Sequence, residues 1–360
     1  MRQLATIRTI ASTRPIQGAD RIEVAQVDGW ECVVKKGEFE VGQQIVYVEV
    51  DSVMPERPEF EFLRDRKFRV RTIKLRGQIS QGLVLPLDIL PAGNYKLGDD
   101  VTELLGVTKY DPQAQQEALL LTNQPETPAN PVAKFLMRFK WYRRLFMKPK
   151  RKGGFPDWIV KTDETRIQNL TTLFDSESKK RTPFSVTEKV DGQSATYFLQ
   201  KISRRKYEFG VCSRNIRLGA PDNSSYWTIA RKYDIENVLK KLIGEYQTIV
   251  LQGEICGDGI QGNKYHISGY DFFAFNLIYP DHKCTTAEIK KALAPFGIKS
   301  VPIIEEGKIL PESIAELVEY SKGKSVVRKE QKREGVVMRN VRNNISFKVI
   351  NPDFLLAEKD

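Results

Sequence analysis

The sequence predicts an α+β protein in which a small N-terminal β-barrel precedes a larger mixed domain. Strand-like segments fill residues 1 to about 90, and a stretch rich in Gln and Pro follows at 111–130. From residue 157 onward, strand-like runs at 184–189, 196–199, 248–251 and 335–338 are separated by helix-like stretches near 233–246, 286–296 and 312–321. A chain of 360 residues is long enough for two domains. We therefore expect a barrel over residues 1–100, a linker over 101–156 and a mixed domain over 157–360.

Short alternating strands separated by turn residues predict the barrel. Residues 21–27 alternate apolar and polar side chains, Asp28-Gly29 is a tight-turn pair, and residues 30–34 and 44–50 form further strands. About five such strands with Gly and Pro turns are typical of a small closed barrel. The OB-fold is the commonest nucleic-acid-binding form of such a barrel, so we expect an OB-fold.

Positive charge is concentrated at residues 64–76, which contain seven basic residues and one acidic residue. In a strand over residues 67–71, Lys67, Arg69 and Arg71 would share one face. Charge of this kind can simply protect an edge strand from aggregation. Seven cations exceed that need, and we therefore expect these residues to contact nucleic-acid phosphates.

The linker contains a second basic segment. Residues 134–152 carry nine basic residues, five aromatic residues and no acidic residue. Four of the aromatic residues recur at helical spacing: Phe135, Phe139, Tyr142 and Phe146. Such a helix could dock between the domains, contact nucleic acid through Arg143 and Arg144, or bind a membrane surface. The first two roles are compatible, and we favour them over the third.

Composition excludes several classes of protein. The net charge of +11 favours a polyanionic partner. No apolar run approaches the ~18 residues of a membrane span, so no membrane partner is expected. The four cysteines form no CxxC pair and there are two histidines, which argues against a structural zinc site and a disulfide scaffold. Residues 1–18 superficially resemble a transit peptide but alternate as a strand does, so we expect a cytoplasmic, intracellular protein.

A lysine in the mixed domain stands at the end of a predicted strand. The string Glu188-Lys189-Val190-Asp191-Gly192 places it before an Asp-Gly turn, which alone is a weak signal. The order of the later strings is more specific. They are Ser213-Arg214-Asn215, Gln252-Gly253-Glu254, Asp271 to Asn276, Arg333 to Met338 and Ser346 to Ile350.

This ordered series resembles the motifs of the covalent nucleotidyltransferases, which include polynucleotide ligases and capping guanylyltransferases. Within that superfamily, the strings TDETRIQ at 162–168 and QGEICGDGIQGNKY at 252–265 are similar to those of ATP-dependent RNA ligases with an N-terminal OB domain. The strings GADRIEVAQVDGW at 18–30 and DSVMP at 51–55 resemble the OB module of that branch. The resemblance implies an ATP-grasp-like ligase adenylation domain, with antiparallel sheets and flanking helices.

The resemblance assigns Lys189 as the nucleophile that attacks the α-phosphorus of ATP. Forming the neutral amine at pH 7 costs about 4.6 kcal/mol at an ordinary lysine pKa, so we expect a metal and nearby cations to lower it. Lys348 and Arg214 would bind phosphate. Glu254 and Glu334, with Asp191, would hold Mg²⁺ or Mn²⁺ through waters.

The other nucleotide-binding residues are implied in the same way. Glu188 would read the adenine, and either Phe273 or Phe275 would stack on it. The alternation of a strand places both rings on one face, so the choice stays open. Arg166 and Asp191 would handle the departing pyrophosphate, and Asn215 belongs to the same nucleotide-binding set.

The implied activity is the joining of RNA 3′-OH and 5′-phosphate ends through lysyl-AMP and RNA-adenylate intermediates. A nicked duplex is the expected substrate, RNA repair the expected role and a monomer the expected state. The alternatives are an ATP-dependent DNA ligase, a capping-type guanylyltransferase and a non-catalytic RNA-binding protein. One departure is visible: many ligases carry lysines at i and i+2 in the last motif, and here the first is Ser346. Arg342 or Lys264 are the cations that the sequence offers instead.

Overall fold

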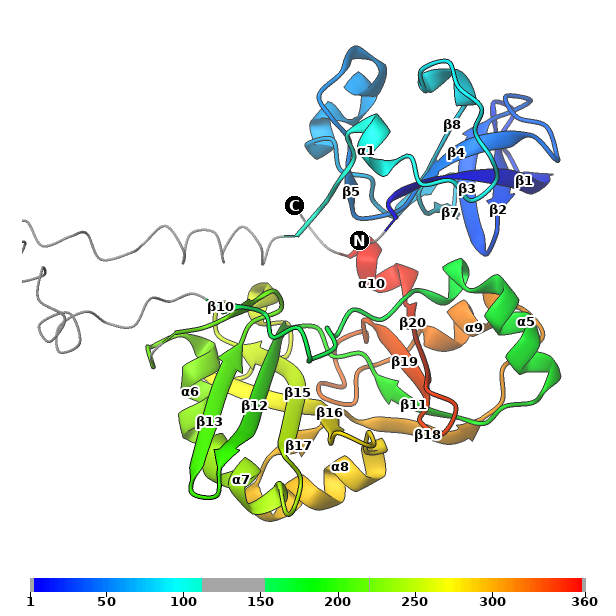
Figure 1. Ribbon diagram of the computed structural model, residues 1–360. Helices are drawn as coiled ribbons and strands as arrows, with labels where there is room; N and C mark the ends of the chain where they lie inside the picture. The colour runs from blue at the N-terminus through cyan, green and yellow to red at the C-terminus, as the bar shows by residue number, and fades with distance from the viewer. Residues whose placement is uncertain (1–2, 112–152, 220, 358–360) are drawn as a thin grey trace, which may run out of the picture.

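The computed structural model describes residues 3–111, 153–219 and 221–357. An N-terminal barrel, blue to cyan, lies above a mixed domain, green to red, and the C-terminal helix α10 (Pro352–Leu356) lies between them (Figure 1). The mixed α+β fold with an N-terminal barrel is confirmed. The basic linker segment with Arg143 and Arg144 lies outside the described residues.

The barrel is a curved sheet with the strand order β3-β2-β1-β4-β8. Its strands are β1 (Ala5–Pro15), β2 (Ile22–Val27), β3 (Trp30–Lys35), β4 (Gln44–Val48) and β8 (Leu83–Leu85). A bulge between Ile10 and Ser12 bends β1, so that its first half pairs with β4 and its second half with β2. The amide of Gln81 donates to the carbonyl of Glu31 at 2.9 Å, which nearly closes the barrel.

Smaller elements complete the barrel. Strand β5 (Ser52–Val53) pairs with β9 (Thr108–Lys109), and β6 (Ile73–Leu75) pairs with β7 (Gln78–Ser80). The 3₁₀ helices η1 (Pro58–Arg66) and η2 (Leu87–Ile89) and the short helix α1 (Thr102–Leu105) lie between them. Leu105 of α1 packs in the same core as Ile7 and Val46. The expected boundary at residue 100 therefore falls before elements that still pack on the barrel.

The basic segment at residues 67–71 is not a regular strand. Lys67 and Phe68 follow η1 with positive φ angles of 52° and 58°. Arg69 forms an isolated bridge with Val53. Phe68 and Val70 are nevertheless buried. The apolar side chains therefore face the interior, as the alternation predicts, although the chain forms a turn here and pairs with Val53 through one bridge only.

Two antiparallel sheets form the mixed domain. The larger has the order β10 (Gly153–Gly154), β14 (Ile216–Arg217), β13 (Lys206–Cys212), β12 (Gln193–Ser203), β15 (Thr248–Gly257), β16 (Tyr270–Ile278) and β17 (Lys299–Ser300), the last pair being parallel. The smaller has the order β18 (Ile303–Lys308), β11 (Phe184–Glu188), β19 (Gly335–Asn340) and β20 (Ile345–Ile350).

Helices cover both sheets. Helices α6 (Ser225–Lys232), α7 (Ile235–Leu242) and α8 (Thr286–Leu293) share one core with the larger sheet. Helices α5 (Thr171–Lys179) and α9 (Ile314–Ser321), with the 3₁₀ helix η3 (Ile167–Asn169), share another with the smaller sheet. The 3₁₀ turns η4 (Gln261–Asn263) and η5 (Ala294–Phe296) complete the domain. The helices expected near residues 233–246, 286–296 and 312–321 are confirmed by α7, α8 and α9, whereas α6 was not predicted.

The tight turn between β2 and β3 docks the barrel on η3. The amide of Gly29 donates to the carbonyl of Gln168 at 3.3 Å, and the indole of Trp30 donates to the Asn169 side chain at 2.6 Å. A Cβ at Gly29 would lie 2.9 Å from the Cα of Gln168. Only glycine allows this approach, which fixes the barrel beside Arg166.

Candidate active site

A cavity of about 750 Å³ lies where the two sheets of the mixed domain meet the barrel. It collects most of the residues that the sequence singled out: Arg166, Glu188, Lys189, Asp191, Arg214, Glu254, Phe275, Glu334 and Lys348. The barrel contributes Asp51, Arg69, Arg71, Lys109 and Tyr110. The predicted residues are thus brought together, and the barrel is part of the wall.

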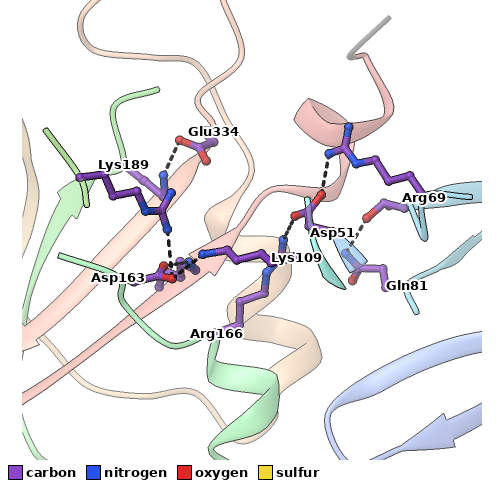
Figure 2. A network of polar contacts seen from close by, with 11 residues as sticks. Asp51, Arg69, Gln81, Lys109, Asp163, Arg166, Lys189 and Glu334 are labelled. Carbon is purple, nitrogen blue, oxygen red and sulfur yellow. Dashed lines mark hydrogen bonds and ion pairs between the residues drawn. The ribbon is translucent and has the colours of Figure 1, made fainter. Parts of the chain in front are cut away.

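Lys189 is placed by the end of a strand. Strand β11 ends at Glu188, which pairs with Val336 of β19. This register brings Lys189 beside Glu334, which immediately precedes β19. The Lys189 amine lies 2.7 Å from a Glu334 carboxylate oxygen (Figure 2). The nucleophile candidate therefore begins in an ion pair.

The surroundings of Lys189 are acidic rather than cationic. Burial alone would lower the pKa of the Lys189 amine, but Glu334, Glu254 and Asp191 outweigh burial and hold that pKa above its ordinary value. The expectation that neighbouring cations lower this pKa was therefore wrong for the described protein groups. Without an added cation the amine stays protonated.

The carboxylates near Lys189 fit a hydrated divalent cation. Burial, and then the repulsion of Glu334 and Asp191, raises the pKa of Glu254 to about 8 against the pull of Lys189. Burial and Glu334 raise the pKa of Asp191 to about 6, although Lys264 pairs with it at 2.7 Å. Carboxylates that repel each other in this way would gain from a cation. In the described ranges, no group of three acidic, His or Cys side chains lies close enough together to hold a metal ion directly.

The glycine of the Lys189 motif is required by packing. A Cβ at Gly192 would lie 2.3 Å from the carbonyl oxygen of Ile255 and 2.8 Å from the sulfur of Cys256. Since β12 pairs with β15 there, neither strand can move freely. We expect Gly192→Ala to lower the free energy of unfolding by at least about 2 kcal/mol, measured by urea unfolding. In Gly154→Ala, where nothing lies within 4 Å of the added Cβ, stability should be unchanged; equal losses in both would contradict the packing argument.

One carboxylate gathers three cations from three parts of the chain. Asp163 lies 3.0 Å from the Lys109 amine, 3.0 Å from the Arg214 guanidinium and 3.1 Å from the Lys348 amine. Burial opposes its ionisation, but Lys348, Arg214 and Lys109 hold the pKa of Asp163 well below its ordinary value. Figure 2 shows Lys109 of the barrel directed at Asp163 of the mixed domain. The three cations against one anion leave a positive wall suited to phosphate.

A second ion pair joins the barrel to the mixed domain. Arg166 is 5% exposed, and its guanidinium lies 3.1 Å from Asp51. Asp51 also pairs with Arg69 at 2.6 Å. The Nε and one terminal nitrogen of Arg166 are buried without a protein partner. Buried guanidinium nitrogens of this kind are suited to an anion in the cavity.

Glu188 and Phe275, two of the residues predicted to contact adenine, both line the cavity. One Glu188 oxygen accepts from the Val326 amide at 2.7 Å, and the Ser325 hydroxyl and the Val327 amide are further hydrogen-bond donors to this carboxylate. The register of β15 and β16 steps from Gln252–Asn276 to Gly253–Ala274, so Phe275 is a bulge residue. Phe275 lines the Lys189 cavity, whereas Phe273 lines a different cavity, although both rings pack in one hydrophobic cluster.

Some predicted residues lie elsewhere. Lys67 is exposed outside the cavity, and Asn215 lies in the turn between β13 and β14 without lining it. Sequence reasoning had not singled out Asp51, Lys109, Asp163 and Arg339, which do line the cavity. Asp51 and Asp163 stand inside strings quoted for the resemblance, which was an available signal. No feature of the sequence pointed to Lys109 or Arg339.

In the described residues no helix is both long and apolar enough to span a membrane.

Comparison with known proteins agrees with this arrangement. A family model described as an OB-fold domain matches residues 4–87, and one described as RNA ligase matches residues 182–350. No curated protein matches the chain.

Solved structures of an RNA ligase from Naegleria gruberi resemble the whole chain. A mutant with AMP and Mn is 34% identical, with a TM-score of 0.80 and coverage of 100% of both chains. A mutant with ATP and Mn gives the same identity, TM-score and coverage. The enzyme with PPi is 34% identical, with a TM-score of 0.79 over 99% of this chain and 98% of that one. The chain therefore belongs to the RNA ligase family, in the form that carries an N-terminal OB-fold domain.

Proposed function

We propose that this protein is an ATP-dependent RNA ligase that joins 3′-OH and 5′-phosphate ends through lysyl-AMP and RNA-adenylate intermediates. The observation that carries the proposal is the position of Lys189. Its amine lies 2.7 Å from Glu334 in a cavity that also holds the carboxylates of Glu254 and Asp191 and the cations Lys109, Arg214 and Lys348. A nucleophile between a cation site and a phosphate site suits nucleotidyl transfer.

The carboxylates prepare the amine for attack. Glu254 and Glu334, with Asp191, would hold a Mg²⁺ or Mn²⁺ ion through waters. Such an ion, when bound, supplies positive charge that favours the neutral amine of Lys189. Glu334 is the protein group in hydrogen-bond contact with the Lys189 Nζ proton, at 2.7 Å. Without the ion, Glu334 keeps that proton in place.

Three transfers then follow. The Lys189 nitrogen bonds to the α-phosphorus of ATP as the bond to the β-phosphate oxygen breaks, and pyrophosphate leaves. The RNA 5′-phosphate next displaces Lys189 from that phosphorus and becomes a 5′–5′ pyrophosphate. The RNA 3′-OH finally attacks the 5′-phosphorus, forms the phosphodiester and releases AMP. Lys348, Arg214 and Arg166 line the same cavity and would stabilise the charge that develops on phosphate.

The nucleotide would lie with its base toward Phe275. The ring of Phe275 supplies a stacking surface, and the Glu188 carboxylate supplies an acceptor for an exocyclic amine. Burial raises the pKa of Glu188, which means that its charged form is poorly solvated. A hydrogen-bond donor on the nucleotide would stabilise that charged form. These contacts favour adenine over guanine, whose corresponding position is a carbonyl.

The substrate and setting are further parts of the proposal. Arg69 and Arg71 of the barrel line the cavity, and exposed Lys67 adds charge nearby, so a nicked RNA duplex could lie across the barrel and the mixed domain. A role for Arg143 and Arg144 in RNA binding stays a prediction. We expect a monomer. Four buried, unpaired cysteines suit the reducing interior of a cell.

Intact mass spectrometry tests the proposal. The purified protein would be incubated with Mg²⁺ and ATP, GTP or NAD, after pyrophosphate treatment to remove any adenylate already bound. We expect one AMP adduct with ATP alone. A GMP adduct would favour a capping-type guanylyltransferase, and no adduct would favour a non-catalytic RNA-binding protein. Sealing of all-DNA nicks at the rate of RNA nicks would favour a DNA ligase.

A further inference from the structure

Ser346 of β20 has a cationic neighbour on the adjacent, paired strand β19. In the register of β19 and β20, Arg339 stands directly opposite Ser346. Directly opposed residues of an antiparallel pair project from the same face of the sheet. Arg339 therefore places a guanidinium beside the position where many ligases carry the first lysine of the last motif.

Arg339 is held by contacts from two other segments. Its guanidinium donates to the carbonyl of Phe275 at 3.0 Å and lies 3.4 Å from a Glu164 oxygen. The same Glu164 oxygen accepts from the Ser346 hydroxyl at 2.7 Å. Arg339 is 7% exposed, and its Nε is buried without a protein partner. Arg339 also lines the Lys189 cavity. Arg339 is thus a buried cation in the wall of the cavity where ATP is proposed to bind.

The bond to Phe275 matters because Phe275 is the bulge residue of β16. A bulge residue loses its partner in the ladder, and its backbone needs another one. Arg339 supplies this partner from the facing sheet, with its guanidinium 5.6 Å from the centre of the Phe275 ring. The orientation of the ring toward the cavity therefore depends on a residue from β19.

The two cations that the sequence offered in place of the missing lysine do not fill this position. Arg342 lies in the exposed turn between β19 and β20 and does not line the cavity. Lys264 lines the cavity but is bound to Asp191 at 2.7 Å and lies over the ring of Phe354. Of Arg339, Arg342 and Lys264, Arg339 is the one that contacts Glu164, the residue to which the Ser346 hydroxyl donates.

We propose that Arg339 is a positioning residue for ATP binding, which fixes the bulged Phe275 and supplies from β19 the positive charge that Ser346 lacks on β20. This assignment rests on the proposed function. It separates two contributions: a hydrogen bond to the Phe275 carbonyl and a charge beside the nucleotide. Each can be removed by a different substitution.

The test measures formation of the lysyl-AMP adduct against ATP concentration. Arg339→Gln keeps a donor for the Phe275 carbonyl and removes the charge; Arg339→Met removes both. We expect the KM for ATP to rise about tenfold in Arg339→Gln and about 100-fold in Arg339→Met, because charged hydrogen bonds contribute about that much. The rate at saturating ATP should stay within about fivefold. Adding Ser346→Lys to Arg339→Gln should return the KM to within about threefold of the parent.

Controls separate this role from folding. Arg342→Gln removes a neighbouring exposed arginine and should leave the KM unchanged. Each variant is checked by thermal unfolding, since misfolding lowers the amount of active enzyme and not its affinity for ATP. An unchanged KM in Arg339→Met, a raised KM in Arg342→Gln, or no recovery with Ser346→Lys would overturn the assignment. Absence of any adduct on the parent protein would overturn the proposed function, and this assignment with it.

Discussion

Replacing Lys189 with alanine is expected to abolish the AMP adduct and to slow sealing of nicked RNA by at least about 10⁴-fold. The reason is that no other group in the cavity can form the covalent intermediate from the same place, and losses of this size are usual when a nucleophile is removed. The measurement is intact mass after incubation with ATP and Mg²⁺, beside sealing of a labelled nicked duplex.

Two controls sharpen this prediction. Lys189→Arg keeps the positive charge beside Glu334, so the protein should fold normally, but a guanidinium is not deprotonated at neutral pH and should form no adduct. A substrate that already carries a 5′-adenylate bypasses the lysine, so Lys189→Ala should seal it faster than a 5′-phosphate substrate. An AMP adduct on Lys189→Ala would place the nucleophile elsewhere, and Lys264 or Lys348 would then be the candidates.

Replacing Arg166 with glutamine is expected to slow adduct formation by about 10²–10³-fold, a loss typical of removing one preorganised donor for developing charge. Asp51→Asn should have a smaller effect in the same direction, because Arg166 then loses its carboxylate partner across the domain boundary. In the double variant the losses should not add, since both act through one ion pair of 3.1 Å. The measurement is the rate of AMP-adduct formation in all three variants.

A barrel arginine outside the cavity supplies the matched control for Arg166. Arg14 pairs with Glu31 at 2.8 Å, and its side chain is 50% exposed. Exposed pairs of this kind contribute little, so Arg14→Gln should change the rate by less than about twofold. Fully additive effects of Arg166→Gln and Asp51→Asn would show that Arg166 acts without the barrel. In that case the barrel would serve RNA binding and not the reaction with ATP.

The local sequence pattern was sufficient to predict the two strands that position Lys189 and Glu334. Alternation over residues 184–189 predicted a strand that ends at the lysine, and β11 ends at Glu188. The string beginning at Arg333 predicted a strand preceded by a carboxylate, and β19 begins one residue after Glu334. Antiparallel pairing of these strands then brings Lys189 and Glu334 together. The order of motifs therefore identified both the family and the nucleophile candidate.

Other parts of the site could not be read from local pattern. Alternation places Phe273 and Phe275 on the same face and could not choose between them, whereas in the structure the bulge residue Phe275 lines the Lys189 cavity and Phe273 lines another. The basic segment at residues 67–71 suggested a regular strand, whereas Lys67 and Phe68 form a turn with positive φ angles and Arg69 pairs with Asp51 at the cavity wall. In each case a pairing partner distant in the sequence decided where the side chain points.

By itself, the sequence determined the α+β class, the N-terminal barrel, the RNA ligase family and the carboxylates beside Lys189. Those features depend on residue order and on the periods of strands, which are local properties. The tertiary structure alone decided that Lys109 and Asp51 of the barrel complete the cavity, and that Arg339 stands in for the cation absent at Ser346. These depend on docking between domains and on strand register, which bring together residues whose spacing along the chain carries no signal.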